Sequence, residues 1–163
     1  MKRLLLDTNI YGEMIFDADF LGLSRCLKEQ FVVHGFRVIR EELRDIPRSS
    51  RLQGRNLRIS LLHIYDELIK KEYHITVEME QLSKEYYLVY HQLGSIHPYD
   101  KMRNDFLIVA CATINQIDLV VSEDNKTLLV ENALKAYQIV NQQKNRQTPN
   151  FIGYLELRRL LLG

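Results

Sequence analysis

Cysteine is scarce in this chain, and the sequence has no pattern of metal-binding thiols. The 163 residues include two cysteines, Cys26 and Cys111, no Cys-x-x-Cys pair and five scattered histidines. Each cysteine lies in an apolar helical pattern, and a small buried thiol is the usual form of cysteine in a reducing cytoplasm. We therefore expect two buried free thiols, a cytoplasmic protein and no zinc site.

Long apolar runs are also missing. Even the run at residues 106–112 falls far short of the roughly 20 residues that span a bilayer, and runs such as residues 4–6 and 119–121 are shorter still. The apolar start of the chain meets Asp7 before it reaches the roughly 7–15 apolar residues of an export signal. The sequence thus predicts no membrane segment, and its length and composition fit one globular domain over residues 1–163.

Charge of one sign is not in excess over the whole chain. The 22 Lys and Arg residues nearly balance the 21 Asp and Glu residues, which leaves a net charge of +1. A general attraction to nucleic acid is therefore excluded. The stretch from Arg37 to Arg58 differs from the rest, because it holds seven arginines against three acids.

Short apolar segments alternate with helical patterns along the chain. Buried strands are predicted at residues 3–6, 36–39, 119–121 and 137–140. Helices are predicted near residues 21–31, 41–46, 50–68, 77–93, 105–117, from about 125, and at 151–162. Such alternation predicts an α/β fold with a central parallel sheet of about four to five strands flanked by helices.

Two regions stand apart from this alternation. Residues 49–94 are interpreted as an all-helical insertion within the single domain. The core is expected over about residues 1–140, followed by a polar loop at 141–150. The amphipathic segment at about 151–163 is then expected to dock on the domain or on a partner.

Four acids follow the predicted strands or open the predicted helices. Asp7 comes directly after the first strand, Glu42 just after the second, and Asp124 three residues after the third. Asp105 is predicted to open the buried helix that leads into the third strand, with Asn104 as its cap. Because carboxyl ends of strands and amino ends of the following helices share one edge of a parallel sheet, these acids are expected to converge.

Four converging carboxylates favour a hard divalent cation. Two charges about 4 Å apart oppose each other by roughly 4 kcal/mol at an effective dielectric near 20, and a cation relieves that repulsion. Oxygen ligands suit Mg²⁺ or Mn²⁺, and Mg²⁺ keeps several waters, which leaves room for a phosphate oxygen and an attacking water. The predicted chemistry is metal-assisted hydrolysis of a phosphodiester.

Each acid also has a structural explanation that needs no metal. Asp7 and Asp124 can cap helices, and Glu42 can be a solvated helix residue. Asp105 is harder to explain in this way, because it opens a helix that has almost no polar face. The structural explanation must hold four times at one edge, so the joint functional interpretation is favoured.

Four blocks of the sequence resemble the motifs of PIN-domain ribonucleases. Residues 5–10 (LLDTNI) are similar to the family's opening, and Glu42-Leu43 to its second block. Residues 104–112 (NDFLIVACA) resemble the third block and residues 120–124 (VVSED) the fourth. Each block alone is weak, but the ordered set, covering about residues 1–140, is fairly specific.

The resemblance implies a PIN-like three-layer fold, a Mg²⁺ or Mn²⁺ site and endonucleolytic cleavage of RNA. It implies that the metal-binding and catalytic cluster consists of Asp7, Glu42, Asp105 and Asp124. Asn9 would orient Asp7 or its water, and Ser122 would stand where the family has Thr or Ser near the metal. Many such proteins are VapC-type toxins that pair with an antitoxin and form homodimers.

The chain departs from the family pattern at two acids and in its length. Glu41 competes with Glu42 for the inward position, and Glu123 adds a further acid beside Asp124. The predicted insertion makes the chain longer than the compact toxins. These departures bear on the toxin role more than on the chemistry.

Two further patterns are candidate contacts. One set of arginines is spaced by three, four and three residues: Arg48, Arg51, Arg55 and Arg58. If one helix includes all four, this spacing places them on a single face, where they can bind RNA phosphates. The alternative is a solvated face that pairs with acids. Tyr86, Tyr87 and Tyr90 have the spacing of a base-stacking platform, but a packing stripe in the core or in a dimer is the favoured interpretation.

Three other functions remain open at the level of sequence. One is a metal-dependent phosphohydrolase of a small phosphate ester, which predicts a closed pocket. Another is a non-catalytic RNA-binding or assembly module, which the intact set of acids disfavours. A purely structural scaffold predicts no affinity for metal.

Overall fold

The sheet at the centre of the molecule has five parallel strands. The computed structural model describes residues 1–163. The strands lie in the order β5-β2-β1-β6-β7, and their bounds are β1 Lys2–Leu6, β2 Phe31–Phe36, β5 Lys71–Tyr73, β6 Leu119–Val121 and β7 Asn150–Ile152. Leu4, Leu5 and Leu6 of the central strand β1 are fully buried, as expected of a strand covered on both faces.

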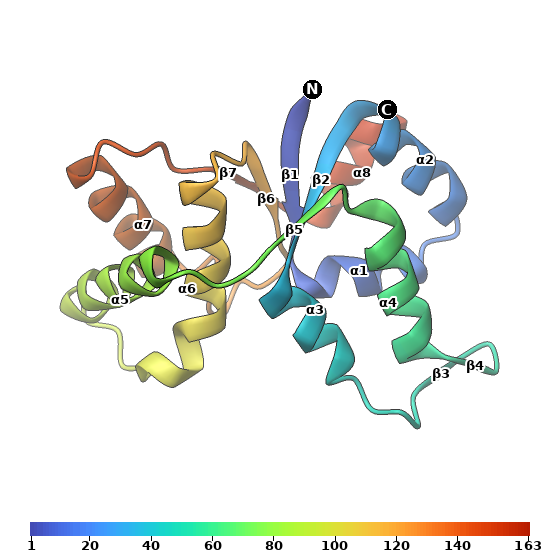
Figure 1. The fold of residues 1–163 in the computed structure, drawn as a ribbon, viewed down its shortest axis with the longest axis horizontal. Coiled ribbons are helices and arrows are strands. Elements are labelled where there is room, and N and C mark those ends of the chain that lie inside the picture. The colour runs from blue at the N-terminus through green and yellow to red at the C-terminus, as the bar shows by residue number, and fades with distance from the viewer.

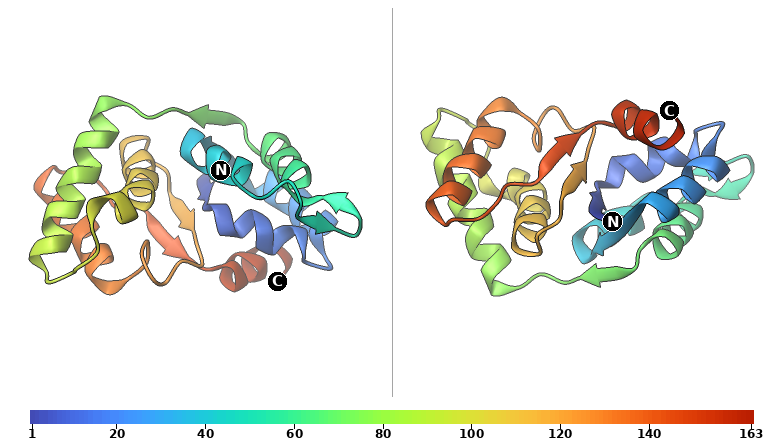
Figure 2. Two further views of the ribbon diagram at one scale, coloured as in Figure 1. Left: turned by 90° about the horizontal axis from the view of Figure 1, so that it is seen from below. Right: turned by 90° about the horizontal axis from the view of Figure 1, so that it is seen from above.

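Helices cover both faces of this sheet, so the predicted three-layer α/β architecture is confirmed. The helices are α1 Thr8–Ile15, α2 Phe20–Gln30, α3 Arg37–Arg44, α4 Leu57–Leu68, α5 Val77–Gln92, α6 Tyr99–Ile114, α7 Glu131–Gln143 and α8 Tyr154–Leu162. Figure 1 shows α5, α6 and α7 on one side of the sheet and the other five on the opposite side. Views from below and above show the same two groups (Figure 2).

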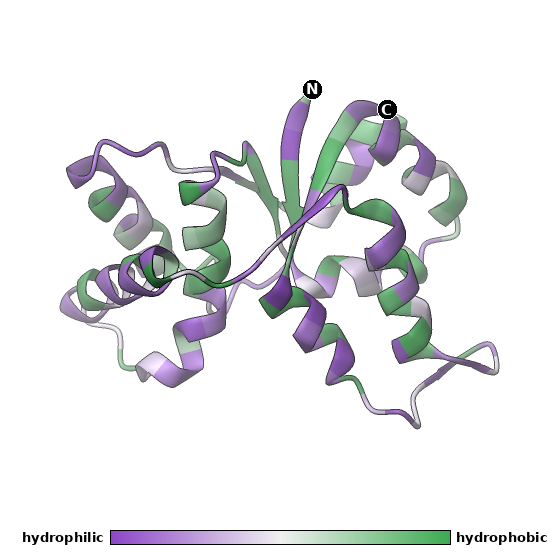
Figure 3. Cartoon of the chain, viewed as in Figure 1, coloured by the Kyte–Doolittle hydropathy of each residue, from purple (hydrophilic) through white to green (hydrophobic).

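One apolar core joins the layers. Forty-two buried hydrophobic side chains form a single cluster, and the hydrophobic residues concentrate along the strands and the inner faces of the helices (Figure 3). Helix α6 lies deepest, since every residue from 106 to 113 is buried. Cys111 is buried as predicted, whereas Cys26 is only half-buried, and both are free thiols. None of the helices combines the length and the apolar character needed to cross a membrane.

Two predicted strands are wrong. Residues 37–39 lie at the start of α3, where Val38, Ile39 and Leu43 form the buried face of an amphipathic helix. The strand is Phe31–Phe36 instead, so only Phe36 of the predicted strand belongs to it. Residues 137–140 belong to α7, whose buried positions also recur at helical spacing. The sheet gains its outer strand from β7, in the segment predicted as a loop and helix.

The region 49–94 is not an all-helical insertion. It contains the β3–β4 hairpin (β3 Arg51–Leu52, β4 Arg55–Asn56), and Asn56, not Ser49 or Ser50, caps α4. It also contributes β5, which pairs with β2 and forms one edge of the central sheet. This region is therefore part of the sheet's own βαβ connection.

The C-terminal segment docks on its own chain. Helix α8 packs beside α2, the Tyr154 hydroxyl donates to Asp17 at 2.5 Å, and Arg158 pairs with the same carboxylate at 3.0 Å. These contacts hold the pKa of Asp17 down at about 2. Gly153 joins β7 to α8, so the docked helix directly follows the strand that pairs with β6.

Candidate active site

Asp7 stands at the carboxyl end of the central strand. It directly follows Leu6, and its backbone N–H donates to the carbonyl of Val121 on the neighbouring strand β6 at 2.9 Å. One carboxylate oxygen accepts from the Thr8 N–H at 2.7 Å, so Asp7 caps α1. The other accepts from the Ser122 hydroxyl at 2.6 Å. Asp7 is only 5% exposed, and burial raises its pKa despite these bonds.

Asp105 and Asp124 share a hydrogen-bonding partner. The hydroxyl of Thr127 lies 2.6 Å from Oδ2 of Asp105 and 2.6 Å from Oδ2 of Asp124. Oδ1 of Asp124 accepts from the backbone N–H groups of Lys126 and Thr127 at 3.0 Å each. Asp124 therefore closes a turn in the loop after β6 and does not cap a helix, because α7 begins only at Glu131.

Asp105, whose carboxylate lies near that of Asp124, belongs to the interior of a helix. Helix α6 begins at Tyr99, after Pro98, so the prediction that Asp105 opens the helix and that Asn104 caps it is wrong. Asp105 lies in the second turn of α6. The helix still brings its carboxylate to Asp124, because α6 runs past the edge where β1 and β6 end (Figure 1).

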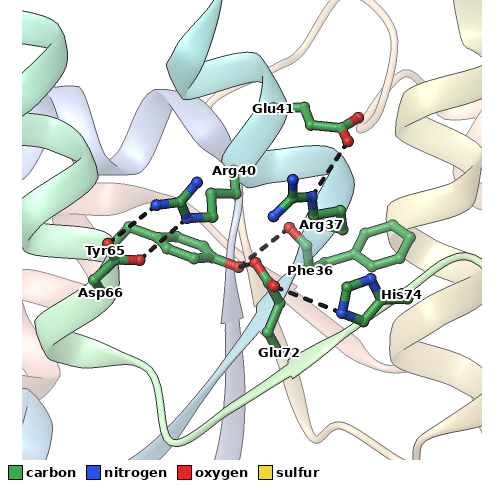
Figure 4. Close-up of polar contacts among 8 residues, drawn as sticks. All are labelled: Phe36, Arg37, Arg40, Glu41, Tyr65, Asp66, Glu72 and His74. Carbon is green, nitrogen blue, oxygen red and sulfur yellow. Dashed lines mark hydrogen bonds and ion pairs between the residues drawn. The ribbon is translucent and has the colours of Figure 1, made fainter.

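Glu42 and not Glu41 faces the other acids. The Thr8 hydroxyl donates to Oε1 of Glu42 at 2.9 Å. Glu41 points outward and pairs with Arg37 at 3.3 Å, as Figure 4 shows. The extra acid Glu123 is also accounted for, because its carboxylate accepts from the backbone N–H of Tyr154 at the start of α8.

The four acids influence one another electrostatically. Burial is the main cause that raises the pKa of Asp105 to about 7, and the charges of Asp7, Asp124 and Glu42 raise it further. Burial likewise raises the pKa of Glu42 to about 7, with added repulsion from Asp7 and Asp124. Four chain segments thus bring their carboxylates into one partly dry region with an unfavourable concentration of negative charge.

This donor set fits a hard divalent cation held partly through water. All the donors are oxygens, which suits Mg²⁺ or Mn²⁺. No three Asp, Glu, His or Cys side chains in the structure are arranged as direct ligands of one ion. Mg²⁺ commonly takes one or two carboxylates and retains waters. Direct bonds from two acids, with the others acting through water, would therefore fit both the oxygen donors and the absence of three direct ligands.

The supporting residues differ partly from those predicted. Ser122 is fully buried and both donates to Asp7 and accepts from the Asp124 N–H at 3.0 Å. Asn9 makes no direct hydrogen bond to Asp7, and its side-chain oxygen accepts from the Glu123 N–H at 3.3 Å. Thr8 and Thr127 were not anticipated. Their only sequence signal is a hydroxyl residue one or three positions after an acid.

The four arginines do not share one helical face. Arg51 and Arg55 lie on the β3–β4 hairpin, Arg48 precedes it, and only Arg58 is helical. The turn of the β3–β4 hairpin places Gln53 and Gly54 at φ 50° and 77°, the left-handed conformation of a tight hairpin. None of the four arginines forms an ion pair with an acid, whereas Arg40, on α3, pairs with Asp66 at 3.2 Å (Figure 4). The alternative that they pair with acids is therefore not what the structure shows.

The tyrosine pattern belongs to the core. Tyr86 and Tyr90 are buried, and their rings pack edge-on against Phe106 of α6, with centroids 6.4 Å and 5.4 Å from it. Tyr87 is half-buried, and its hydroxyl donates to the His97 carbonyl at 2.9 Å. The packing interpretation is confirmed for this stripe.

No protein-family model and no curated protein matches the chain, but solved structures share its fold. A chain of VapBC2 from Rickettsia felis, bound to a DNA fragment from its promoter, has a TM-score of 0.61 at 16% identity, over 93% of this chain and 98% of that one. A chain of DNA-bound VapBC from Salmonella typhimurium has a TM-score of 0.58 at 10% identity, over 94% and 99%. A chain of FitAB bound to the IR36 DNA fragment has a TM-score of 0.54 at 14% identity, over 93% and 94%.

These likenesses concern the fold, because the identities are low. They extend over nearly the whole of each chain, including the C-terminal segment. The chain therefore shares the three-layer α/β fold of chains in these VapBC and FitAB structures, which is the architecture that its sequence motifs implied.

Proposed function

We propose that this protein is an endoribonuclease that depends on Mg²⁺ or Mn²⁺. The observation that carries the proposal is the convergence of Asp7, Glu42, Asp105 and Asp124 at the carboxyl edge of the sheet, from four separate segments. Ser122, Thr8 and Thr127 hold these acids by hydrogen bonds of 2.6–2.9 Å. Burial and mutual repulsion make the metal-free cluster electrostatically unfavourable, which is what a cation would relieve.

The four acids would bind the ion in different ways. Asp7 and Asp105 are its principal ligands in this proposal, and Glu42 and Asp124 complete the site directly or through water. A bound divalent ion supplies polarisation of a phosphate oxygen and a lowered pKa for an attacking water. Ser122 fixes the carboxylate of Asp7 from a fully buried position, so the ligand is oriented before the ion arrives.

The substrate and partners follow from the resemblance and from the fold. RNA is the substrate of the family that the motifs resemble. Structures with the same fold are solved as VapBC and FitAB assemblies on DNA. We extend this to the present chain as a toxin that pairs with an antitoxin and forms a homodimer.

An Asp7→Asn variant tests the chemistry. Purified wild type is expected to cut a mixed single-stranded RNA in Mn²⁺ and not in EDTA, and the variant is expected to lose cleavage while keeping its circular dichroism spectrum and a cooperative thermal transition. Glu41→Gln is the matched control, because Glu41 is exposed and faces Arg37. Wild-type cleavage by Asp7→Asn would refute the assignment. Turnover of p-nitrophenyl phosphate without RNA cleavage would favour the small-ester phosphohydrolase.

The unpaired arginines around the hairpin are the proposed contacts to the RNA backbone. The hairpin extends on the same side of the molecule as the carboxyl ends of the strands (Figure 1). Single-stranded binding loses about 0.7 in its logarithmic salt slope for each phosphate contact removed. An Arg51→Gln/Arg55→Gln double variant, made in the Asp7→Asn background, should therefore flatten the slope by more than one.

A matched pair of arginines elsewhere controls for total charge. Arg25 on α2 and Arg159 on α8 are exposed and form no ion pair. Replacing both with Gln removes the same charge, and the salt slope should stay near that of the parent. Equal effects of the two double variants would show that the hairpin has no special role.

A further inference from the structure

One side chain connects two of the four acids. Thr127 is half-buried in the loop between β6 and α7, and its hydroxyl oxygen lies 2.6 Å from an oxygen of Asp105 and 2.6 Å from an oxygen of Asp124. Asp105 comes from α6 and Asp124 from the loop, so the hydroxyl bridges two elements. Thr127 is also the only residue that hydrogen-bonds to the Asp105 carboxylate.

The bridge limits how far the two carboxylates can separate. Because each oxygen lies 2.6 Å from the same hydroxyl, their separation cannot exceed twice that distance. Two oxygen ligands of one Mg²⁺ ion, at bonds near 2.1 Å, stand roughly 3 Å apart when adjacent and 4.2 Å apart when opposite. The Thr127 hydroxyl is the only group that hydrogen-bonds to both carboxylates, since the other bonds of Asp124 use its other oxygen.

We propose that Thr127 is a positioning residue that sets the affinity of the acidic cluster for Mg²⁺ or Mn²⁺, by holding the carboxylates of Asp105 and Asp124 within reach of one ion. The inference rests on the proposed function, and it assigns a role that none of the sequence motifs contains. Groups that orient metal ligands typically change metal affinity by about 10–100-fold when they are removed.

Thr127→Val removes the hydroxyl and keeps the shape of the side chain. The turn of the loop remains, because its backbone N–H to Asp124 bond does not use the hydroxyl. Thr127→Ser keeps the hydroxyl. Thr148→Val is a matched control, because Thr148 precedes β7 and its hydroxyl accepts from Asn141, away from the acids.

Mn²⁺ binding to the full chain without RNA is the measurement, with free Mn²⁺ followed by electron paramagnetic resonance and folding by thermal midpoint. Thr127→Val should weaken the dissociation constant about 10–100-fold, and Thr127→Ser and Thr148→Val should stay within about threefold of wild type. A purely structural Thr127 would lower the thermal midpoint and leave the dissociation constant unchanged.

Two results would overturn the inference independently. One is a folded Thr127→Val that binds Mn²⁺ as wild type does. The other, which holds even if the valine variant does not fold, is a folded Thr127→Ser whose affinity falls by tenfold or more. A wild-type protein that binds no Mn²⁺ would instead remove the proposed function, and this inference with it.

Discussion

Replacing Asp105 with Asn should stabilise the metal-free protein at neutral and alkaline pH. The fold holds the pKa of this carboxyl at about 7 instead of its ordinary 3.8, through burial and the charges of Asp7, Asp124 and Glu42. The folded protein thus binds the proton more tightly than the unfolded chain. Stability is therefore lost as pH rises from about 4, and the loss is complete above about 7.

The size of this loss follows from the pKa. One pKa unit corresponds to 1.36 kcal/mol, so the shift from 3.8 to about 7 amounts to roughly 4 kcal/mol at pH 8. Asn removes the charge and keeps an oxygen that can accept from Thr127, but its NH₂ group must be accommodated. We expect the variant to gain about 2–4 kcal/mol over wild type at pH 8 and almost nothing at pH 4.

Urea unfolding in EDTA at pH 4.5, 6 and 8 measures this difference. Glu41→Gln, which removes an exposed acid from the neighbouring helix, should show no comparable gain. Mg²⁺ or Mn²⁺ should stabilise wild type and not Asp105→Asn, because the variant lacks a principal ligand. A stability difference that does not grow between pH 4.5 and 8 would refute the electrostatic reasoning.

Two predictions concern β2. Gly35→Ala would place a methyl group 2.3 Å from the hydroxyl oxygen of the buried Tyr65, so urea unfolding should show a loss of at least about 1–3 kcal/mol, and wild-type stability would count against the packing. His34 is 7% exposed with neither ring nitrogen hydrogen-bonded, and burial, with Arg3 and Lys71 nearby, lowers its pKa. In the unfolded chain His34 takes up a proton below about pH 6.5, whereas in the folded protein it stays neutral, so its contribution to stability falls as pH drops. His34→Leu should therefore gain stability relative to wild type in thermal melts from pH 7 to 5, and a difference that does not change with pH would count against this reasoning.

The sequence places all four acids at one edge of the sheet, but the secondary structure on which that prediction rests is correct for only some of them. Asp7 and Asp124 follow β1 and β6, whose uninterrupted apolar runs mark them as buried strands. Glu42 was expected after a strand at 36–39, but it lies in the second turn of a helix that begins at Arg37. The acid still reaches the cluster, because the helix starts earlier and places Glu42 one turn farther along.

Strand β2 and strand β7 show where local pattern fails. His34 and Gly35 interrupt the apolar character of β2, whereas residues 36–39 imitate a strand with the buried face of a helix. Strand β7 has only three residues in a polar stretch. Strand β7 forms because it can pair with the free edge of β6. A prediction from neighbouring residues alone does not detect pairing with a segment that is distant in the sequence.

The hydroxyl contacts could not be predicted for a different reason. The sequence shows that Thr127 lies three residues after Asp124, but the bridge to Asp105 needs the packing of α6 against the loop after β6. A strand-end argument places carboxylates at an edge. It carries no information on which hydroxyl spans the distance between two of them.

The position of Asp105 explains why the cluster keeps its unfavourable charge. Every residue from 106 to 113 of α6 is buried, so the helix cannot shift outward to separate Asp105 from the other acids without exposing that apolar surface. At about 25 cal/mol per Å², one exposed leucine or phenylalanine costs roughly 1.5–3 kcal/mol, and a shift of α6 would expose several. Exposing three such side chains costs more than the roughly 4 kcal/mol by which burial and repulsion disfavour the ionised Asp105. The core therefore holds the carboxylates together, and only protons or a cation can relieve them.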